Sequence, residues 1–226
     1  MTRADEGIDQ AVAKLRAPIG KVQITGPEGL LESVVSMPAA GQVPRGWAIV
    51  CHPHPLHGGS LRNKVVHYLS RTLTSLGLAC VRFNFRGVGS SSGAYDQGQG
   101  EQEDLVAVIE WCRRQAHGSR LWLAGFSFGA YIAAVVAERC SADCLITVSP
   151  PVRMFNRSTF SPPACPWYVV QGTEDEVVSC EAVQNWVASL QPRPALLLLP
   201  GATHFFHGKL ESLRARLISA LEPVTS

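Results

Sequence analysis

The chain has 226 residues, of which 46% are hydrophobic and 17% are charged, and its formal net charge is +2. This length and hydrophobic content predict a soluble globular protein with the core of one large domain. The small net charge and the scattered basic residues do not favour nucleic acid or an anionic membrane as a partner. The longest apolar runs, such as residues 195–200, are too short to cross a bilayer, so we expect no membrane span.

The cysteines and the N-terminal residues indicate a compartment. The seven cysteines are an odd number without the paired spacing of a metal site, which is typical of free thiols in a reducing cytosol. Residues 1–19 contain acidic side chains and no apolar core, so we do not expect a signal peptide. We therefore predict a cytoplasmic protein that needs no cofactor, and the sequence leaves its oligomeric state open.

The first part of the chain predicts an arm and a hairpin. Residues 1–18 are polar and are expected to form a flexible N-terminal arm, followed by a single domain over residues 19–226. Two β-rich runs, residues 21–25 and 30–37, flank the turn-forming residues 26–29, a pattern typical of a β-hairpin.

Beyond the hairpin, apolar strands alternate with helical patterns. The expected strands cover residues 47–51, 78–85, 144–148, 167–170 and 195–199, with a further strand that begins at residue 121. The expected helices cover residues 64–76, 101–115, 130–138, 177–190 and 205–221. This alternation predicts a mostly parallel sheet covered by helices on both faces, with its chemistry outside the carboxyl ends of the strands.

The most informative stretch is a serine flanked by glycines, Gly125-Phe-Ser127-Phe-Gly129, between an apolar strand and an apolar helix. A sharp strand-to-helix turn strains the backbone of its central residue, and glycines at the flanking positions remove collisions with the neighbouring strand and helix. The serine hydroxyl would lie beside free N–H groups at a helix N-terminus, where negative charge is stabilised. Ser127 is therefore the candidate nucleophile. The alternative is an ordinary strand-to-helix turn, and the residues later in the chain distinguish the two interpretations.

Candidate partners of this serine follow two later strands. The strand over residues 167–170 runs into three carboxylates at positions 174–176, and the strand over residues 195–199 runs into His204. A serine hydroxyl needs a base within hydrogen-bond reach, and the base needs an acid that holds its tautomer. The order serine, acid, histidine, each at the carboxyl end of a strand, favours nucleophilic catalysis over an ordinary turn.

From about residue 21 to its end the chain resembles an α/β-hydrolase, through the serine turn, Gly-x-x-Asp-x-Val-Val at 172–178 and Gly-x-x-His at 201–204. It is most similar to a compact, nearly capless bacterial branch near the dienelactone-hydrolase-like and small carboxylesterase groups. The stretches that carry this similarity are His-Pro-His-Pro-x-x-Gly-Gly at 52–59 and Arg-Phe-Asn-Phe-Arg-Gly-x-Gly-x-Ser at 82–91. The resemblance implies an α/β-hydrolase fold with a mostly parallel central sheet, helices on both faces, an N-terminal antiparallel hairpin and a minimal or absent cap. Dienelactone hydrolases use cysteine where this chain has serine, so their reaction is not implied.

The resemblance also implies which acid and which base act with Ser127. Asp175 fits the superfamily's spacing after the glycine of the acid turn, so Glu174 and Glu176 are interpreted as solvated turn charges. His204 is the expected base, and its rival His207 is expected to pack or cap within the start of the last helix.

The oxyanion hole should combine the backbone N–H of Phe128 with one from the loop after residues 47–51. Proline has no N–H, which leaves His54, Leu56 and His57 as donors in that loop. His54 occupies the position that matches the superfamily's usual donor.

The function predicted from these residues is a serine hydrolase that cleaves small carboxylic esters or thioesters through an acyl-enzyme. One alternative is a metallohydrolase built on His52, His54 and His57, and another is a non-catalytic interaction module with the same fold. The sequence leaves two interpretations open for Arg86 and for residues 151–163. Arg86 either binds an anionic substrate group or braces loops, and residues 151–163 either line a substrate pocket or cover the sheet edge.

Overall fold

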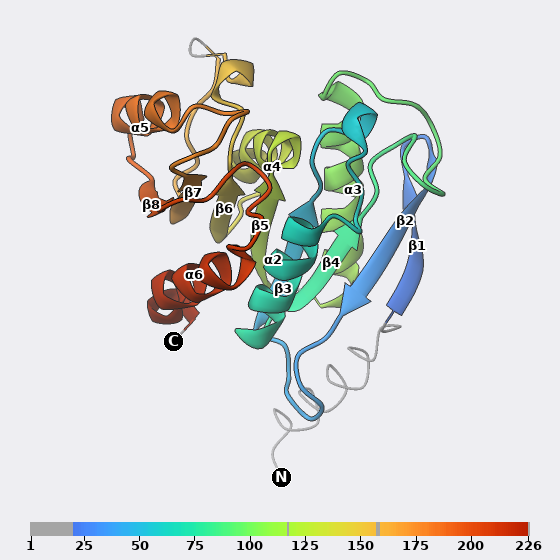
Figure 1. Cartoon of the computed structure of the whole chain (residues 1–226). Helices are drawn as coiled ribbons and strands as arrows, with labels where there is room; N and C mark the ends of the chain where they lie inside the picture. Colours follow the sequence, from blue (N-terminus) through green and yellow to red (C-terminus); the bar gives the residue numbers. More distant parts are fainter. Residues whose placement is uncertain (1–19, 117, 157–158, 226) are drawn as a thin grey trace.

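The computed structural model describes residues 20–116, 118–156 and 159–225, so the arm expected over residues 1–18 lies outside the described residues. The described residues form an eight-stranded sheet in the order β1-β2-β4-β3-β5-β6-β7-β8 (Figure 1). Its strands are β1 Gly20–Gly26, β2 Gly29–Ser36, β3 Gly46–Cys51, β4 Ala79–Phe83, β5 Arg120–Phe126, β6 Cys144–Val148, β7 Trp167–Gly172 and β8 Ala195–Leu199. Strands β1 and β2 form the antiparallel hairpin, β2 pairs antiparallel with β4, and all other neighbours are parallel.

Helices cover both faces of the sheet, as predicted. They are α2 Lys64–Ser75, α3 Gln99–Gln115, α4 Phe128–Arg139, α5 Cys180–Ser189 and α6 Leu210–Thr225, with short 3₁₀ turns at Pro55–His57 and Val152–Met154. One core lies under α3, α4 and α5, and a second core lies under α2 and α6 on the opposite face (Figure 1). Strand β3 is buried along its whole length because it faces both cores, which explains its continuous apolar sequence. The α/β-hydrolase fold expected from the sequence is confirmed.

Two helices begin later than the sequence predicts, and both differences have a local cause. Helix α5 begins at Cys180, because the preceding Val177 and Val178 give their N–H groups to the side chain of Asp175 and so form a turn. Helix α6 begins at Leu210, and Gly208 before it has a left-handed φ of 67° that ends any helical path. Both turns lie at the carboxyl ends of strands, where the candidate site residues are found.

Candidate active site

Ser127 lies at the turn between β5 and α4 with φ 53° and ψ −119°, a strained conformation for a residue with a side chain. The flanking glycines are required by close backbone contacts. A Cβ at Gly125 would collide with the backbone of Gly129, and a Cβ at Gly129 would collide with the carbonyls of Cys51 and His52. The steric reason inferred from the sequence pattern therefore agrees with the packing of this turn.

The structure brings Ser127, His204 and Asp175 together from three separate turns. The Nε2 atom of His204 lies 3.3 Å from Oγ of Ser127, and its Nδ1 atom lies 2.9 Å from Oδ2 and 3.0 Å from Oδ1 of Asp175. An ionised carboxylate only accepts hydrogen bonds, so Nδ1 of the neutral imidazole carries the proton and Nε2 presents its lone pair to the serine. His204 is only 3% exposed, which shields both bonds from water.

The carboxylate of Asp175 is held by a full set of donors. Its Oδ1 accepts the N–H groups of Val177 at 3.0 Å and Val178 at 2.8 Å, and its Oδ2 accepts from Nε2 of Gln171 at 3.0 Å. Burial raises the pKa of Asp175, but the hydrogen bonds from His204 and Val178 outweigh burial and hold this pKa below its ordinary value. The side chain is therefore an anion in a fixed orientation.

Gln171 is a site residue that the sequence reasoning missed. It is fully buried at the end of β7, and its amide donates both to Asp175 and, at 3.0 Å, to the carbonyl of Val178. It thereby ties the acid turn to its strand. The available signal was a glutamine at the end of the otherwise apolar strand Trp-Tyr-Val-Val-Gln-Gly, because a buried polar side chain needs partners.

The rival acids and the rival base lie outside this constellation. Glu174 is exposed, as expected. Glu176 is also exposed but not merely solvated, because its Oε2 accepts the backbone N–H of His204 at 3.1 Å and so links the acid turn to the base turn. His207 lies exposed in the turn before α6, not in the start of a helix, and its ring contacts Phe205.

Within the described residues, two backbone N–H groups of the serine turn and the adjoining loop are left without a hydrogen-bond partner. The N–H groups of Phe128, the first residue of α4, and of His54 take part in no hydrogen bond within the described parts of the chain. The loop that carries His54 touches the serine turn, because the carbonyl of His52 lies against Gly129 and the ring of His54 lies 5.1 Å from that of Phe128. Free N–H groups are what an oxyanion hole needs, and this role of Phe128 and His54 stays a prediction.

His52 holds the loop in place through both of its ring nitrogens. Nε2 accepts the N–H of Phe85 at 3.1 Å, so Nδ1 carries the proton and donates to the carbonyl of Pro53 at 2.6 Å. Burial lowers the pKa of His52 to about 4, so the ring is neutral near pH 7.

The side chains of His52, His54 and His57 do not form a metal site. Both nitrogens of His52 are occupied, and the ring of His54 accepts the N–H of Leu56 and contacts the hydroxyl of Tyr95. Among the described residues, no group of three or more histidines, cysteines and acids has the arrangement of metal ligands. The metallohydrolase alternative is not favoured.

The buried His52 predicts a specific loss of stability in acid. The unfolded chain binds a proton near pH 6.5 and the folded chain only near pH 4, so this contribution is complete above pH 6.5 and is lost as the pH falls toward 4. The slope approaches about 1.4 kcal/mol per pH unit. Urea unfolding at pH 7.5 and pH 5 should show a smaller decrease for His52→Gln, which cannot titrate, than for the wild type. His57→Gln removes an exposed imidazole nearby and should behave like the wild type; equal slopes in all three proteins would contradict this account.

Arg86 braces loops, which is one of the two roles expected for it. It is 6% exposed, its Nη2 donates to Oδ1 of Asp104 at 2.8 Å, and its own N–H donates to Oδ2 at 2.9 Å. This pair raises the pKa of Arg86 and ties the glycine-rich loop to α3.

In the segment 151–163, Phe155 is buried against Trp186 and Tyr131, so this aromatic side chain covers the core.

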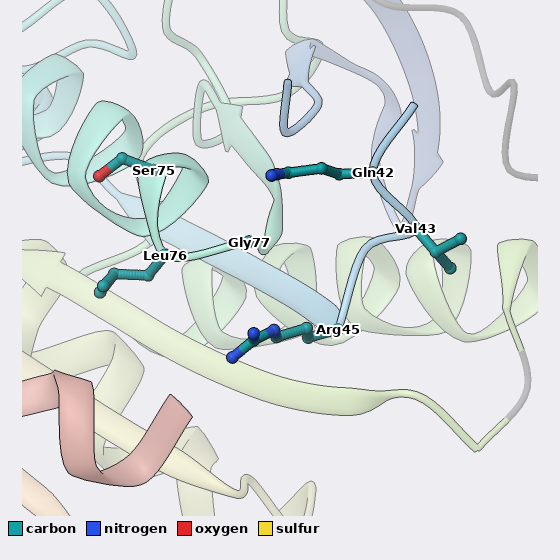
Figure 2. Close-up of a pocket in the computed structure, with 6 residues that line it drawn as sticks. All are labelled: Gln42, Val43, Arg45, Ser75, Leu76 and Gly77. Carbon is teal, nitrogen blue, oxygen red and sulfur yellow. The ribbon is translucent and has the colours of Figure 1, made fainter. Parts of the chain in front are cut away.

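A hollow of about 420 Å³ at the other end of the sheet is unrelated to this chemistry. Figure 2 shows its lining, which is Gln42, Val43, Arg45, Ser75, Leu76 and Gly77. These residues precede β3 and β4, at the amino ends of the parallel strands, whereas Ser127 follows the carboxyl end of β5.

In the described part of the chain there is no helix long and apolar enough to cross a membrane.

Comparisons with known proteins identify the family of this fold. A family model described as the alpha/beta hydrolase fold matches residues 49–164. A solved structure from Xanthomonas campestris, described as a member of the a/b serine hydrolases without lid, is 43% identical, has a TM-score of 0.86, and the match covers 90% of this chain and 94% of that one. An alpha-beta serine hydrolase homologue from Coxiella burnetii is 47% identical with a TM-score of 0.86, over 89% of this chain and 96% of that one. An uncharacterised protein of Rickettsia prowazekii is 35% identical over 201 residues, which is 84% of each chain.

Proposed function

The chain belongs to the alpha/beta hydrolase fold family, whose fold supports hydrolase activity, and we propose that it is a serine hydrolase that cleaves carboxylic esters or thioesters. The observation that carries this proposal is the hydrogen-bonded series from Asp175 through His204 to Oγ of Ser127. The similarity to lidless structures described as serine hydrolases supports it.

Each side chain has a defined role in the proposed reaction. Nε2 of His204 takes the proton from Ser127 as Oγ attacks the carbonyl carbon, and Asp175 stabilises the imidazolium that forms. The N–H groups of Phe128 and His54 donate to the oxyanion of the tetrahedral intermediate. His204 then protonates the leaving oxygen or sulfur, and a water molecule activated in the same way releases the acid and restores Ser127.

The surroundings of these residues favour an uncharged, partly apolar substrate. The large apolar side chains of Leu56, Val177 and Phe205 are exposed, and each lies within two residues of a proposed site residue. Exposed apolar side chains that border a reactive group are typical of a contact surface for an apolar ligand.

A panel of p-nitrophenyl esters of graded acyl length, with matched thioesters and amides, tests the proposal directly. We expect turnover of the esters or thioesters, with faster turnover of longer acyl groups than of the acetyl group. We also expect complete inhibition by a fluorophosphonate. Absence of both turnover and labelling would favour the non-catalytic module, and inhibition by a chelator alone would favour a metal mechanism.

The proposed donor role of His54 predicts different effects for two substitutions. His54 has φ −52°, within the range that proline adopts, so His54→Pro removes the N–H without demanding a new φ. Loss of one oxyanion donor costs about 10²–10³ in turnover. His54→Ala keeps the N–H. It loses weak side-chain hydrogen bonds with Tyr95 and Leu56 and ring contacts with His57 and Phe128, so we expect a decrease of less than about tenfold.

Steady-state kinetics on both His54 variants check this prediction, with thermal melts as the control for loop distortion. If both variants lost activity equally while their melting temperatures stayed at the wild-type value, the imidazole and not the backbone would carry the role.

A further inference from the structure

A second hollow, of about 260 Å³, lies between α2 and β4, away from the proposed active site. It shares Ser75 with the hollow of Figure 2 and includes none of the proposed catalytic residues. Its lining residues are Ser36, Ala39, His67, Ser70, Arg71, Thr74, Ser75 and Arg82. The members from α2 follow a spacing of three and four residues, so they share one face of this helix.

The lining of this hollow is basic and contains no acid. Arg71 and Arg82 bring two guanidinium groups to it, His67 adds an imidazole, and the remaining polar groups are hydroxyls. Within the described ranges, neither arginine forms an ion pair, whereas the nearby Arg62 outside the hollow approaches Glu32 at 3.9 Å.

The polar atoms of the hollow are incompletely satisfied. Nη1 of Arg82 donates to the carbonyl of Leu61 at 2.8 Å, but its buried Nε and the buried hydroxyl of Thr74 have no hydrogen-bond partner in the described chain. Burial lowers the pKa of Arg82, and burial together with the charges of Arg82 and Arg71 lowers the pKa of His67. A half-buried cation without a counter-charge is costly, and a bound anion would offset that cost.

We propose that this hollow binds a tetrahedral oxydianion, either inorganic phosphate or the terminal group of a small phosphomonoester. Arginine is suited to this role because its planar fork donates to two oxygens of such a group, and serine and threonine hydroxyls supply further donors. The volume is several times the roughly 30 Å³ that one water molecule occupies, so it admits the anion.

Titrations of the ¹⁵N-labelled full-length protein by NMR test this proposal, with inorganic phosphate in one arm and glycerol 3-phosphate in the other. Sodium chloride of equal ionic strength is the reference. We expect saturable shifts at residues 67–75 and 82 in at least one arm, and the stronger arm identifies the source of the anion. Shifts that grow linearly without saturation, or that chloride reproduces, would overturn the proposal.

Two variants that each remove one arginine charge distinguish binding in the hollow from nonspecific attraction of anions to a basic surface. Arg71→Gln removes an exposed side chain of the hollow and should weaken binding about tenfold, which corresponds to about 1.4 kcal/mol. Arg62→Gln removes the same charge just before α2, outside the hollow, and should change affinity by less than about twofold. Equal losses in both variants would show nonspecific attraction and would overturn the proposal.

His67 supplies a second readout inside the hollow. The other charged groups that line the hollow are Arg71 on α2 and Arg82 on β4, and the remaining polar groups are the hydroxyls of Ser36, Ser70, Thr74 and Ser75. Sulfate keeps its charge between pH 5 and 8, so it isolates the response of the imidazole. The NMR titration of His67 should move to higher pH when sulfate binds, and less so in Arg71→Gln; an unchanged titration at saturating sulfate would place the anion elsewhere.

Discussion

Replacing Ser127 with alanine should reduce ester turnover by roughly 10⁴-fold or more and abolish fluorophosphonate labelling. The proposed mechanism has no other nucleophile, and the residual rate would come from binding and the oxyanion donors alone. The fold should not change, because alanine has the same strain as serine at a φ of 53° and, among the described residues, the hydroxyl has a hydrogen bond with His204 alone. Turnover, labelling and a thermal melt of the purified variant check the three parts of this prediction.

The matched control for this experiment is Ser90→Ala. Ser90 is an exposed serine in the glycine-rich loop, and its replacement should leave both labelling and turnover at the wild-type level. Peptide mapping of the labelled wild-type protein should identify the modified residue as Ser127. Labelling of Ser127→Ala at the wild-type rate would show that another residue is the nucleophile and would refute the proposed role.

Replacing Asp175 with asparagine should lower kcat by roughly 10⁴-fold. An amide offers one acceptor oxygen and one NH₂ donor, but His204, Gln171 and two backbone N–H groups all donate to the carboxylate. The NH₂ group would therefore face a donor. The imidazole would then favour the tautomer with its proton on Nε2, which cannot accept the proton of Ser127.

Glu174→Gln removes a charge from the same turn and serves as the control. Glu174 is exposed and forms no part of the hydrogen-bonded series, so its replacement should change kcat by less than about threefold, as expected for a screened surface charge. Circular dichroism of both variants separates catalysis from folding. If Glu174→Gln were the variant that lost activity, the acid would be displaced by one residue from its proposed position.

The fold and the proposed catalytic residues could be predicted because they depend on local sequence rules. The spacing of apolar residues and the glycines at the ends of elements indicate the order of strands and helices. Parallel strands place their carboxyl ends at one edge of the sheet. Ser127 directly follows β5 and His204 lies in the turn after β8, so the topology places both at this edge. Because β6 and β7 separate these two strands, the contact between the two side chains depends on how the turns pack. The close contacts of Gly125 and Gly129 likewise follow from a sharp strand-to-helix turn, which only glycine at the flanks permits.

Only the tertiary structure decided the features that depend on which side chains meet across long separations in sequence. The donation by Gln171 to Asp175, the pairing of Arg86 with Asp104 and the bond from the N–H of His204 to Glu176 each depend on how separate turns pack. The later start of α5 has the same origin, because Asp175 takes the N–H groups that would otherwise begin the helix.

The basic hollow has no sequence signal at all. Arg71 and Arg82 belong to different elements, and an isolated arginine on a helix or a strand is typical of a solvated surface. Their shared hollow, without a carboxylate among its lining residues, arises because α2 crosses the face of the sheet onto which Arg82 projects. Sequence periodicity determines that a helix covers this face, but the packing of side chains determines which charges are left beside one another there.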